Sequence, residues 1–137
     1  MSQENVAIIR RAYEALNAGQ PVYSIFHPAL IYHPRADEPD PSAHVGRDAF
    51  ERLLDGFLES FRDLRFDVLK VIDAGDRVIA STMMHGRGAA SGASVEDAYV
   101  IVYRLRDGLV VEGWEYRTKQ EALEAVGLSE QDAHADS

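Results

Sequence analysis

Four consecutive strand-like segments fill most of the second half of the chain and constrain its fold more than any other feature. They cover residues 65–73, 77–88, 94–106 and 109–117. Asp107-Gly108 is typical of a tight hairpin turn, because both residue types tolerate the positive φ that such turns require. Turns this short join antiparallel neighbours. The second half of the chain therefore predicts an antiparallel meander.

Two amphipathic helices are predicted before the meander. Residues 3–18 place their apolar side chains on one face at helical spacing, and residues 47–61 carry a complete apolar stripe. A short strand at 29–33 and a Pro- and acid-rich loop at 35–45 lie between them. Because helices and strands are segregated, we expect an α+β fold in which a curved antiparallel sheet wraps around the N-terminal helices. Such a cone leaves a cavity at its wide end.

Length and composition fit one globular domain. We expect residues 1–128 to form that domain and the polar residues 129–137 to form a flexible tail. The net charge is −9 with no basic stripe, so we expect no nucleic-acid partner, and a small apolar, neutral or cationic ligand fits better. The sequence has no cysteine, basic leader or long apolar run. A cytoplasmic protein without a membrane partner is therefore expected.

No metal or cofactor is expected from the motifs. The histidines form neither a His-x-His nor a His-Glu-x-x-His spacing. Gly86-Arg87-Gly88 opens no predicted helix, so it does not indicate a phosphate-binding loop. No serine nucleophile motif occurs. Chemistry, if present, is expected to depend on side chains acting as acids and bases.

His33 is the first candidate for such chemistry. It ends the strand at 29–33 and precedes Pro34 and the loop, a position from which its ring can enter the cavity. A neutral imidazole accepts a proton at physiological pH, whereas an unperturbed carboxylate is a weak base there. The alternative is a histidine that donates to a backbone carbonyl at the mouth of the loop.

Aromatic and apolar residues are the candidates for a pocket lining. Strand alternation places Tyr99 and Ile101 on one face of their strand, and Trp114 and Tyr116 on one face of the next. The predicted pocket residues are Phe26, Phe57, Phe61, Tyr99, Ile101, Trp114 and Tyr116. The alternative is that these residues form an ordinary core and a dimer interface.

Three carboxylates occupy strand positions. Asp97 shares a face with Tyr99, Glu112 shares a face with Trp114, and Glu115 lies on the face opposite to Glu112. A carboxyl group inside an apolar cup has a raised pKa and can act as an acid or a base. For each of the three, a solvated position on the outer face is the simpler interpretation.

Six segments carry a family resemblance that spans residues 3–128. They are Glu4–Gly19, His27–His33, Gly46–Phe50, Val71–Val78, Tyr103–Gly108 and Tyr116–Leu128. Together they resemble the nuclear transport factor 2-like superfamily, in particular its polyketide-cyclase-like (SnoaL-like) members. The resemblance implies a cystatin-like α+β cone. It implies no single reaction, because this fold hosts isomerases, cyclases, hydrolases, dehydratases and non-catalytic modules.

Ketosteroid isomerase is similar in layout and implies positions for a general base and two oxyanion donors. His33 stands at the place of its general-base aspartate, just before a proline. Ile101 stands at the place of its oxyanion-binding aspartate. Ala12 stands at the place of its tyrosine, with Tyr13 one position and about 100° further around the helix. Because both donors are changed, steroid isomerase activity is not expected.

Two functions follow as hypotheses. The first is a small-molecule-binding protein that moves a proton on a small carbonyl compound without a cofactor, as isomerases, cyclases and some hydrolases do. His33 would be its base, and Tyr13 or Tyr116 would donate to the developing oxyanion. The second is a non-catalytic module that binds a ligand or serves assembly. Val100 and Val102 make the outer face of the sheet apolar as well, which favours a homodimer through that face.

Overall fold

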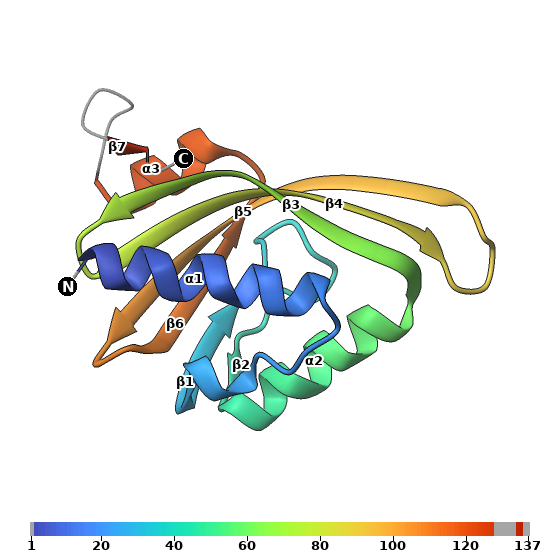
Figure 1. Cartoon of the computed structure of the whole chain (residues 1–137), viewed down its shortest axis with the longest axis horizontal. Coiled ribbons are helices and arrows are strands. Elements are labelled where there is room, and N and C mark those ends of the chain that lie inside the picture. The colour runs from blue at the N-terminus through green and yellow to red at the C-terminus, as the bar shows by residue number, and fades with distance from the viewer. Residues whose placement is uncertain (1, 128–133, 136–137) are drawn as a thin grey trace.

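The chain folds into helices and one curved sheet (Figure 1). The computed structural model describes residues 2–127 and 134–135. In chain order the elements are α1 (Ser2–Asn17), the 3₁₀ turn η1 (Tyr23–Ile25), β1 (Phe26–His33), β2 (His44–Val45), α2 (Arg47–Glu59), β3 (Phe61–Ala74), β4 (Arg77–Gly88), β5 (Ser94–Arg106), β6 (Leu109–Tyr116), α3 (Lys119–Ala125) and β7 (His134–Ala135). The predicted meander and both predicted helices are present, and the expected α+β fold is confirmed.

The sheet has the strand order β2-β1-β6-β5-β4-β3-β7. Its pairs are antiparallel except for β1 and β6, which run parallel, so the sheet is mixed and not antiparallel throughout. Four strands and α2 separate β1 from β6 in the chain, and a connection of that length permits a parallel partner. Across this pair Tyr32 lies opposite Gly113 and His33 opposite Trp114.

The element boundaries differ from the sequence prediction in two regions, and strand pairing explains the differences in both. The second helix ends at Glu59, and Phe61 already begins β3, opposite Gly88 of β4. The first strand extends back to Phe26, and His44–Val45 of the predicted loop pairs with it as β2. Backbone groups at these positions find partners on a neighbouring strand, which the periodicity of a single segment does not indicate.

α1 and α2 cover the concave face of the sheet and enclose the main core (Figure 1). Val6, Ile9 and Tyr13 belong to the predicted apolar face of α1, and each is buried. Leu30 of β1 and Val110 of β6 are fully buried in the same cluster, where the parallel pair meets. The space between these two helices and the strands is therefore where an enclosed cavity is expected.

α3 covers the opposite face of the sheet. A capping box formed by Thr118 and Glu121 begins this helix. Its buried side chains pack with Val100 and Val102, which are 3% and 1% exposed. The two valines that favoured a homodimer are thus covered by α3 of the same chain. A short amphipathic helix can bury an apolar sheet face in the same way that a partner subunit would. The homodimer stays a prediction without support from these residues.

Most of the predicted tail, residues 129–137, lies outside the described residues. Within it, His134–Ala135 form β7 and pair antiparallel with Ile72 and Asp73 of β3. Among the described residues, no helix is long and apolar enough to cross a membrane.

One side chain fastens the end of α1 to the edge of the sheet. Asn17 donates from Nδ2 to the Phe66 carbonyl oxygen at 2.8 Å, and its Oδ1 accepts from the Phe66 backbone N–H at 2.7 Å. At this point β3 pairs with β4 on one side only, so the amide takes the place of a further strand. The contact therefore ties the C-terminal end of α1 to β3.

Asn17→Ala is expected to lower the free energy of unfolding by about 1–3 kcal/mol, because both backbone groups of Phe66 lose their partner. Urea unfolding followed by circular dichroism measures the change. Asn5→Ala is the matched control, since Asn5 reaches the Gly75 carbonyl from an exposed part of the same helix at 3.5 Å. The control should cost less than about 0.5 kcal/mol. Equal stabilities for the two variants would show that the Asn17 contact contributes nothing.

Candidate functional site

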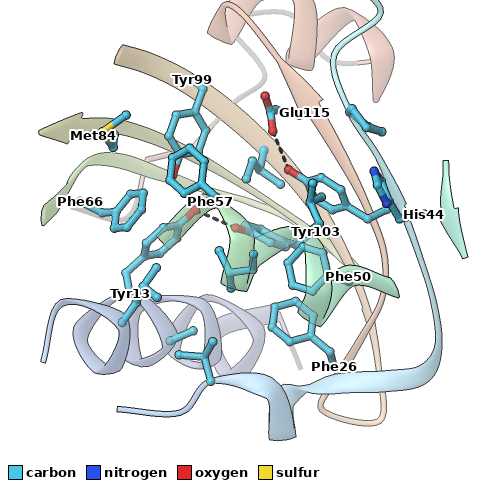
Figure 2. Close-up of a pocket in the computed structure, with 18 of the residues that line it drawn as sticks. Tyr13, Phe26, His44, Phe50, Phe57, Phe66, Met84, Tyr99, Tyr103 and Glu115 are labelled. Carbon is cyan, nitrogen blue, oxygen red and sulfur yellow. Dashed lines mark hydrogen bonds between the residues drawn. The ribbon is translucent and has the colours of Figure 1, made fainter. Parts of the chain in front are cut away.

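A cavity of about 390 Å³ lies between α1, α2 and the concave face of the sheet (Figure 2). Its lining is mostly apolar, and its phenylalanines and tyrosines are Tyr13, Phe26, Tyr32, Phe50, Phe57, Phe66, Tyr99 and Tyr103. The rings pack on one another in tilted and edge-on pairs, such as Phe26 and Phe50 with centroids 4.8 Å apart. The volume falls within the roughly 300–1,000 Å³ that is usual for small-molecule sites.

Gly113 makes room for a tyrosine ring where β1 meets β6. A Cβ atom at this position would lie 3.1 Å from Tyr32 Cδ1 and 3.4 Å from Tyr32 Cε1. The ring of Tyr32 therefore lies over the glycine, its partner across the parallel pair. Glu115 is the next residue of β6 on the same face, because side chains alternate along a strand. The tyrosine ring thus extends toward Glu115.

Glu115 is the carboxyl group at the centre of this arrangement. The Tyr32 hydroxyl donates to Glu115 Oε1 at 2.7 Å, the upper dashed line in Figure 2. Burial raises the pKa of Glu115, and the hydrogen bond from Tyr32 and the charge of Arg35 offset that rise only in part. A carboxyl group whose pKa lies closer to neutral pH is better suited to accept and return a proton than an ordinary glutamate.

A second pair of hydroxyls lies where α1 faces β5. The hydroxyl oxygens of Tyr13 and Tyr103 are 2.7 Å apart, and both side chains are buried (Figure 2). One hydroxyl donates to the other, so the pair retains one O–H that can donate to a ligand. Burial is the main reason that the pKa of each tyrosine lies well above its usual value. Both phenols therefore stay protonated at physiological pH and remain donors.

The open side of the cavity carries charged side chains. Arg35 and Glu38 from the loop after β1, His44 of β2 and Asp97 of β5 line it. Arg35 Nε is 3.8 Å from Glu115 Oε2, and Arg35 Nη1 is 3.9 Å from Asp97 Oδ2. Acidic groups outnumber basic ones at this rim, which favours neutral or cationic ligands. Among the described residues, no group of three or more acidic or histidine side chains is placed to hold a metal ion.

Several predicted site residues do line the cavity. They are Tyr13, Phe26, Phe57, Tyr99 and Ile101. Tyr99 and Ile101 project from the inner face of β5, as strand alternation predicts. Tyr13 projects from α1 toward the sheet (Figure 2). The structure thus brings together the helical and strand halves of the predicted pocket, while the role of each residue stays a prediction.

The expectation that His33 points into the cavity is wrong. Tyr32 points inward, and successive residues of a strand point to opposite faces. His33 instead stacks on Trp114 with ring centroids 5.5 Å apart and planes 7° from parallel. Its Nε2 lies 2.7 Å from Glu112 Oε2, while Glu112 Oε1 accepts from Arg104 at 3.1 Å. His33 therefore belongs to a polar and aromatic cluster on the outer face.

Trp114, Tyr116 and Phe61 also lie outside this cavity. Trp114 and Tyr116 alternate with Gly113 and Glu115 along β6, so they point outward and line a separate open cleft. Tyr116 is therefore not placed to donate to a ligand in the cavity. Phe61 lies at the start of β3, because the helix predicted to carry it has already ended.

Glu115, Tyr32 and Tyr103 were not among the predicted site residues. The interpretation that the strand carboxylates lie on the outer face holds for Glu112 and is wrong for Glu115. It is wrong for Asp97 as well, which lines the cavity with a half-exposed side chain. The last hairpin hid Glu115: the register of Arg106 with Leu109, continued without interruption, would pair Ile101 with Trp114. A register irregularity between Arg104 and Leu105 pairs Ile101 with Glu115 instead. Nothing in the sequence indicated Tyr32, because its position depends on the parallel pairing of β1 with β6.

Three solved structures show the same fold. AclR from Streptomyces galilaeus, proposed to be a hydroxylase, is 20% identical with a TM-score of 0.74, covering 93% of this chain and 83% of that chain. A protein from Jannaschia sp. CCS1, proposed to be a SnoaL-like polyketide cyclase, is 20% identical with a TM-score of 0.73, covering 90% and 91%. A protein with a ketosteroid isomerase-like fold from Catenulispora acidiphila DSM 44928, solved with trimethylamine, is 16% identical with a TM-score of 0.66, covering 89% and 93%.

Sequence comparison gives the family. No curated protein matches the chain. The family model of the SnoaL-like domain matches residues 9–113, which is well over half of the 137 residues. The matched part includes the second half of α1, all of α2 and the paired residues Tyr32 and Gly113 of β1 and β6. The chain therefore belongs to the SnoaL-like domain family.

Proposed function

We propose that the protein binds a small, largely apolar carbonyl compound in this cavity and moves a proton on it, with Glu115 as the base. One observation carries the proposal: a half-buried carboxyl group and a pair of protonated tyrosines line the same aromatic cavity. Acid–base catalysis at a carbon next to a carbonyl requires these two parts, a base for the C–H and a donor for the oxygen.

The chemistry follows from the two hydrogen-bonded pairs. The remaining O–H of the Tyr13–Tyr103 pair donates to the carbonyl oxygen of the ligand. Glu115 takes the proton from the neighbouring carbon, so the C–H bond breaks, a carboxyl O–H bond forms, and the electron pair moves to the oxygen as an enolate. Return of the proton to another carbon completes an isomerisation, and return to the same carbon gives exchange. Tyr32 keeps the base in place throughout through its bond to Oε1.

Binding without chemistry is the alternative. The aromatic lining and acidic rim also suit a small organic cation, since ring faces and carboxylates both attract positive charge. Among proteins of the same fold, the one from Catenulispora acidiphila is bound to trimethylamine. Such a module would keep the cavity and the ion pairs, but it would not accelerate proton exchange.

Glu115→Gln is expected to slow proton exchange by about 10²–10⁴-fold, because an amide keeps the shape of the carboxylate but accepts no proton. The ligand is first chosen from a panel of small carbonyl compounds as one that raises the thermal midpoint of the protein. The measurement is the loss of its α-hydrogen signal in D₂O by ¹H NMR. Glu112→Gln is the matched control, since that carboxylate lies on the outer face of the same strand. An unchanged rate in Glu115→Gln removes Glu115 from the mechanism.

Exchange in the wild-type protein is expected to increase with pH through the pKa of Glu115. Only the ionised carboxylate accepts a proton, so the rate increases about tenfold per unit below that pKa and levels off above it. Because burial raises this pKa, the midpoint should lie above the 4.5 of an ordinary glutamate. A pH–rate profile measures it. A midpoint at or below 4.5 would contradict the assignment of the base.

Replacing both Tyr13 and Tyr103 with phenylalanine is expected to slow exchange by about 10²–10³-fold, the usual cost of losing an oxyanion donor. Each single substitution should cost less, because the hydroxyl that remains still has a proton to donate. Tyr23→Phe is the control, since the Tyr23 hydroxyl bonds Asp55 in an exposed position. A double variant with the rate of the control would show that the hydroxyl pair plays no part.

A further inference from the structure

Arg35 connects the rim of the cavity with the carboxyl group inside it. Its side chain is 16% exposed and lines both the inner cavity and the outer cleft. Because it lies two residues after the end of β1, the strand that positions Tyr32 also positions Arg35. The two oxygens of Glu115 are thus approached from the same side of the fold: Tyr32 donates to Oε1, and Arg35 Nε lies 3.8 Å from Oε2.

The guanidinium of Arg35 is not saturated by its other acidic neighbours. Asp37 Oδ1 is 3.3 Å from Nε, Glu38 Oε1 is 3.4 Å from Nη2, and Asp97 Oδ2 is 3.9 Å from Nη1. Only the contact with Glu38 has hydrogen-bond geometry, and the buried Nε atom has no hydrogen-bond partner. An arginine that only fastened the loop would be expected to bond these acids at shorter distances.

Glu115 is the least exposed of the four acids around Arg35. The side chains of Asp37, Glu38 and Asp97 are 48%, 38% and 50% exposed, whereas that of Glu115 is 22% exposed. Water screens a charge pair at the surface far more than a pair in a half-buried site. Of the four acids around the guanidinium, Glu115 is therefore the one whose charge pair with Arg35 is screened least by water.

Among the described residues that affect the pKa of Glu115 most, Arg35 is the one cation. The groups that face Glu115 are Tyr32 of β1, Arg35 and Glu38 of the following loop, Asp97, Tyr99 and Tyr103 of β5, and Tyr13 of α1. The tyrosines are neutral. Burial, Glu38 and Asp97 raise the pKa of Glu115, and the bond from Tyr32 and the charge of Arg35 lower it.

We propose that Arg35 is a positioning residue for Glu115, whose guanidinium keeps the carboxylate charged and holds Oε2 toward the open side of the cavity. The inference rests on the proposed function, because a base must be ionised before it accepts a proton. The inference assigns a role to a residue outside the Tyr32–Glu115 and Tyr13–Tyr103 pairs. It also explains why an arginine side chain is buried at a rim where acidic groups are more numerous.

A purely steric role for Arg35 would have the opposite effect. Arg35 lies in the wall between the cavity and the outer cleft, since both are lined by it. If it only kept water out, its removal would hydrate Glu115 and lower the pKa of that group. If it supplies charge, its removal raises the pKa. The direction of the change separates the two roles.

The test is a ¹³C NMR titration of the side-chain carboxyl groups, in which the Glu115 signal is identified by its absence in Glu115→Gln. Arg35→Gln is expected to raise the Glu115 midpoint by about one pH unit or more, the usual effect of removing an adjacent cation. Arg35→Lys should restore most of the wild-type midpoint, because it keeps the charge. Arg117→Gln is the matched control, since Arg117 pairs with Asp37 at the surface and is 60% exposed.

An unchanged or lowered Glu115 midpoint in Arg35→Gln would overturn the inference. A rise of equal size in Arg117→Gln or in Arg35→Lys would overturn it as well. Thermal melts of each variant confirm that the titrated protein is folded. Because the titration needs no substrate, its result is independent of catalysis. If the wild-type protein catalyses no proton exchange but Arg35→Gln still raises the Glu115 midpoint, the proposed function is wrong and the role of Arg35 stands. If exchange occurs but the Glu115 midpoint does not rise in Arg35→Gln, only the role of Arg35 is wrong.

Discussion

The hydrogen bond from Tyr32 to Glu115 is the interaction on which the site depends. It forms because Gly113 lets the tyrosine ring lie directly over β6, and the next inward residue of that strand is Glu115. The parallel pairing of β1 with β6 thus joins two parts of the sheet and also places the Tyr32 hydroxyl next to the Glu115 carboxyl group. With Oε1 occupied, the remaining oxygen faces the arginine and the open side of the cavity.

A half-buried carboxyl group has a cost for stability. Its pKa in the folded protein is raised by burial, whereas in the unfolded chain it is that of an ordinary glutamate. In the window between the two values the unfolded state has lost its proton and the folded state still holds it, so the stability contributed by this group falls as pH rises through that window. The apolar cluster of helices and strands around it offsets this cost. A residue retained at such a cost fits a functional role.

The features of the fold that could be predicted are those that depend on neighbouring residues. Three such features are present in the structure: the apolar stripe of the second helix, the turn at Asp107-Gly108 and the capping box at Thr118. Each depends only on residues a few positions apart in the sequence. The start of β3 at Phe61 could not be predicted in this way, because it depends on pairing with β4. The cover that α3 provides over Val100 depends on the fold as a whole.

The sequence by itself determined which residues share a face, because side chains alternate along a strand at fixed spacing. It correctly separated Trp114 from Glu115 and grouped Tyr99 with Ile101. Only the tertiary structure decided which face turns toward the helices. That choice reversed the expectation for His33, which lies outside, and for Glu115, which lies inside. The physical reason is that a strand between two amphipathic layers has apolar neighbours on both sides, and long-range pairing selects the side that encloses the cavity.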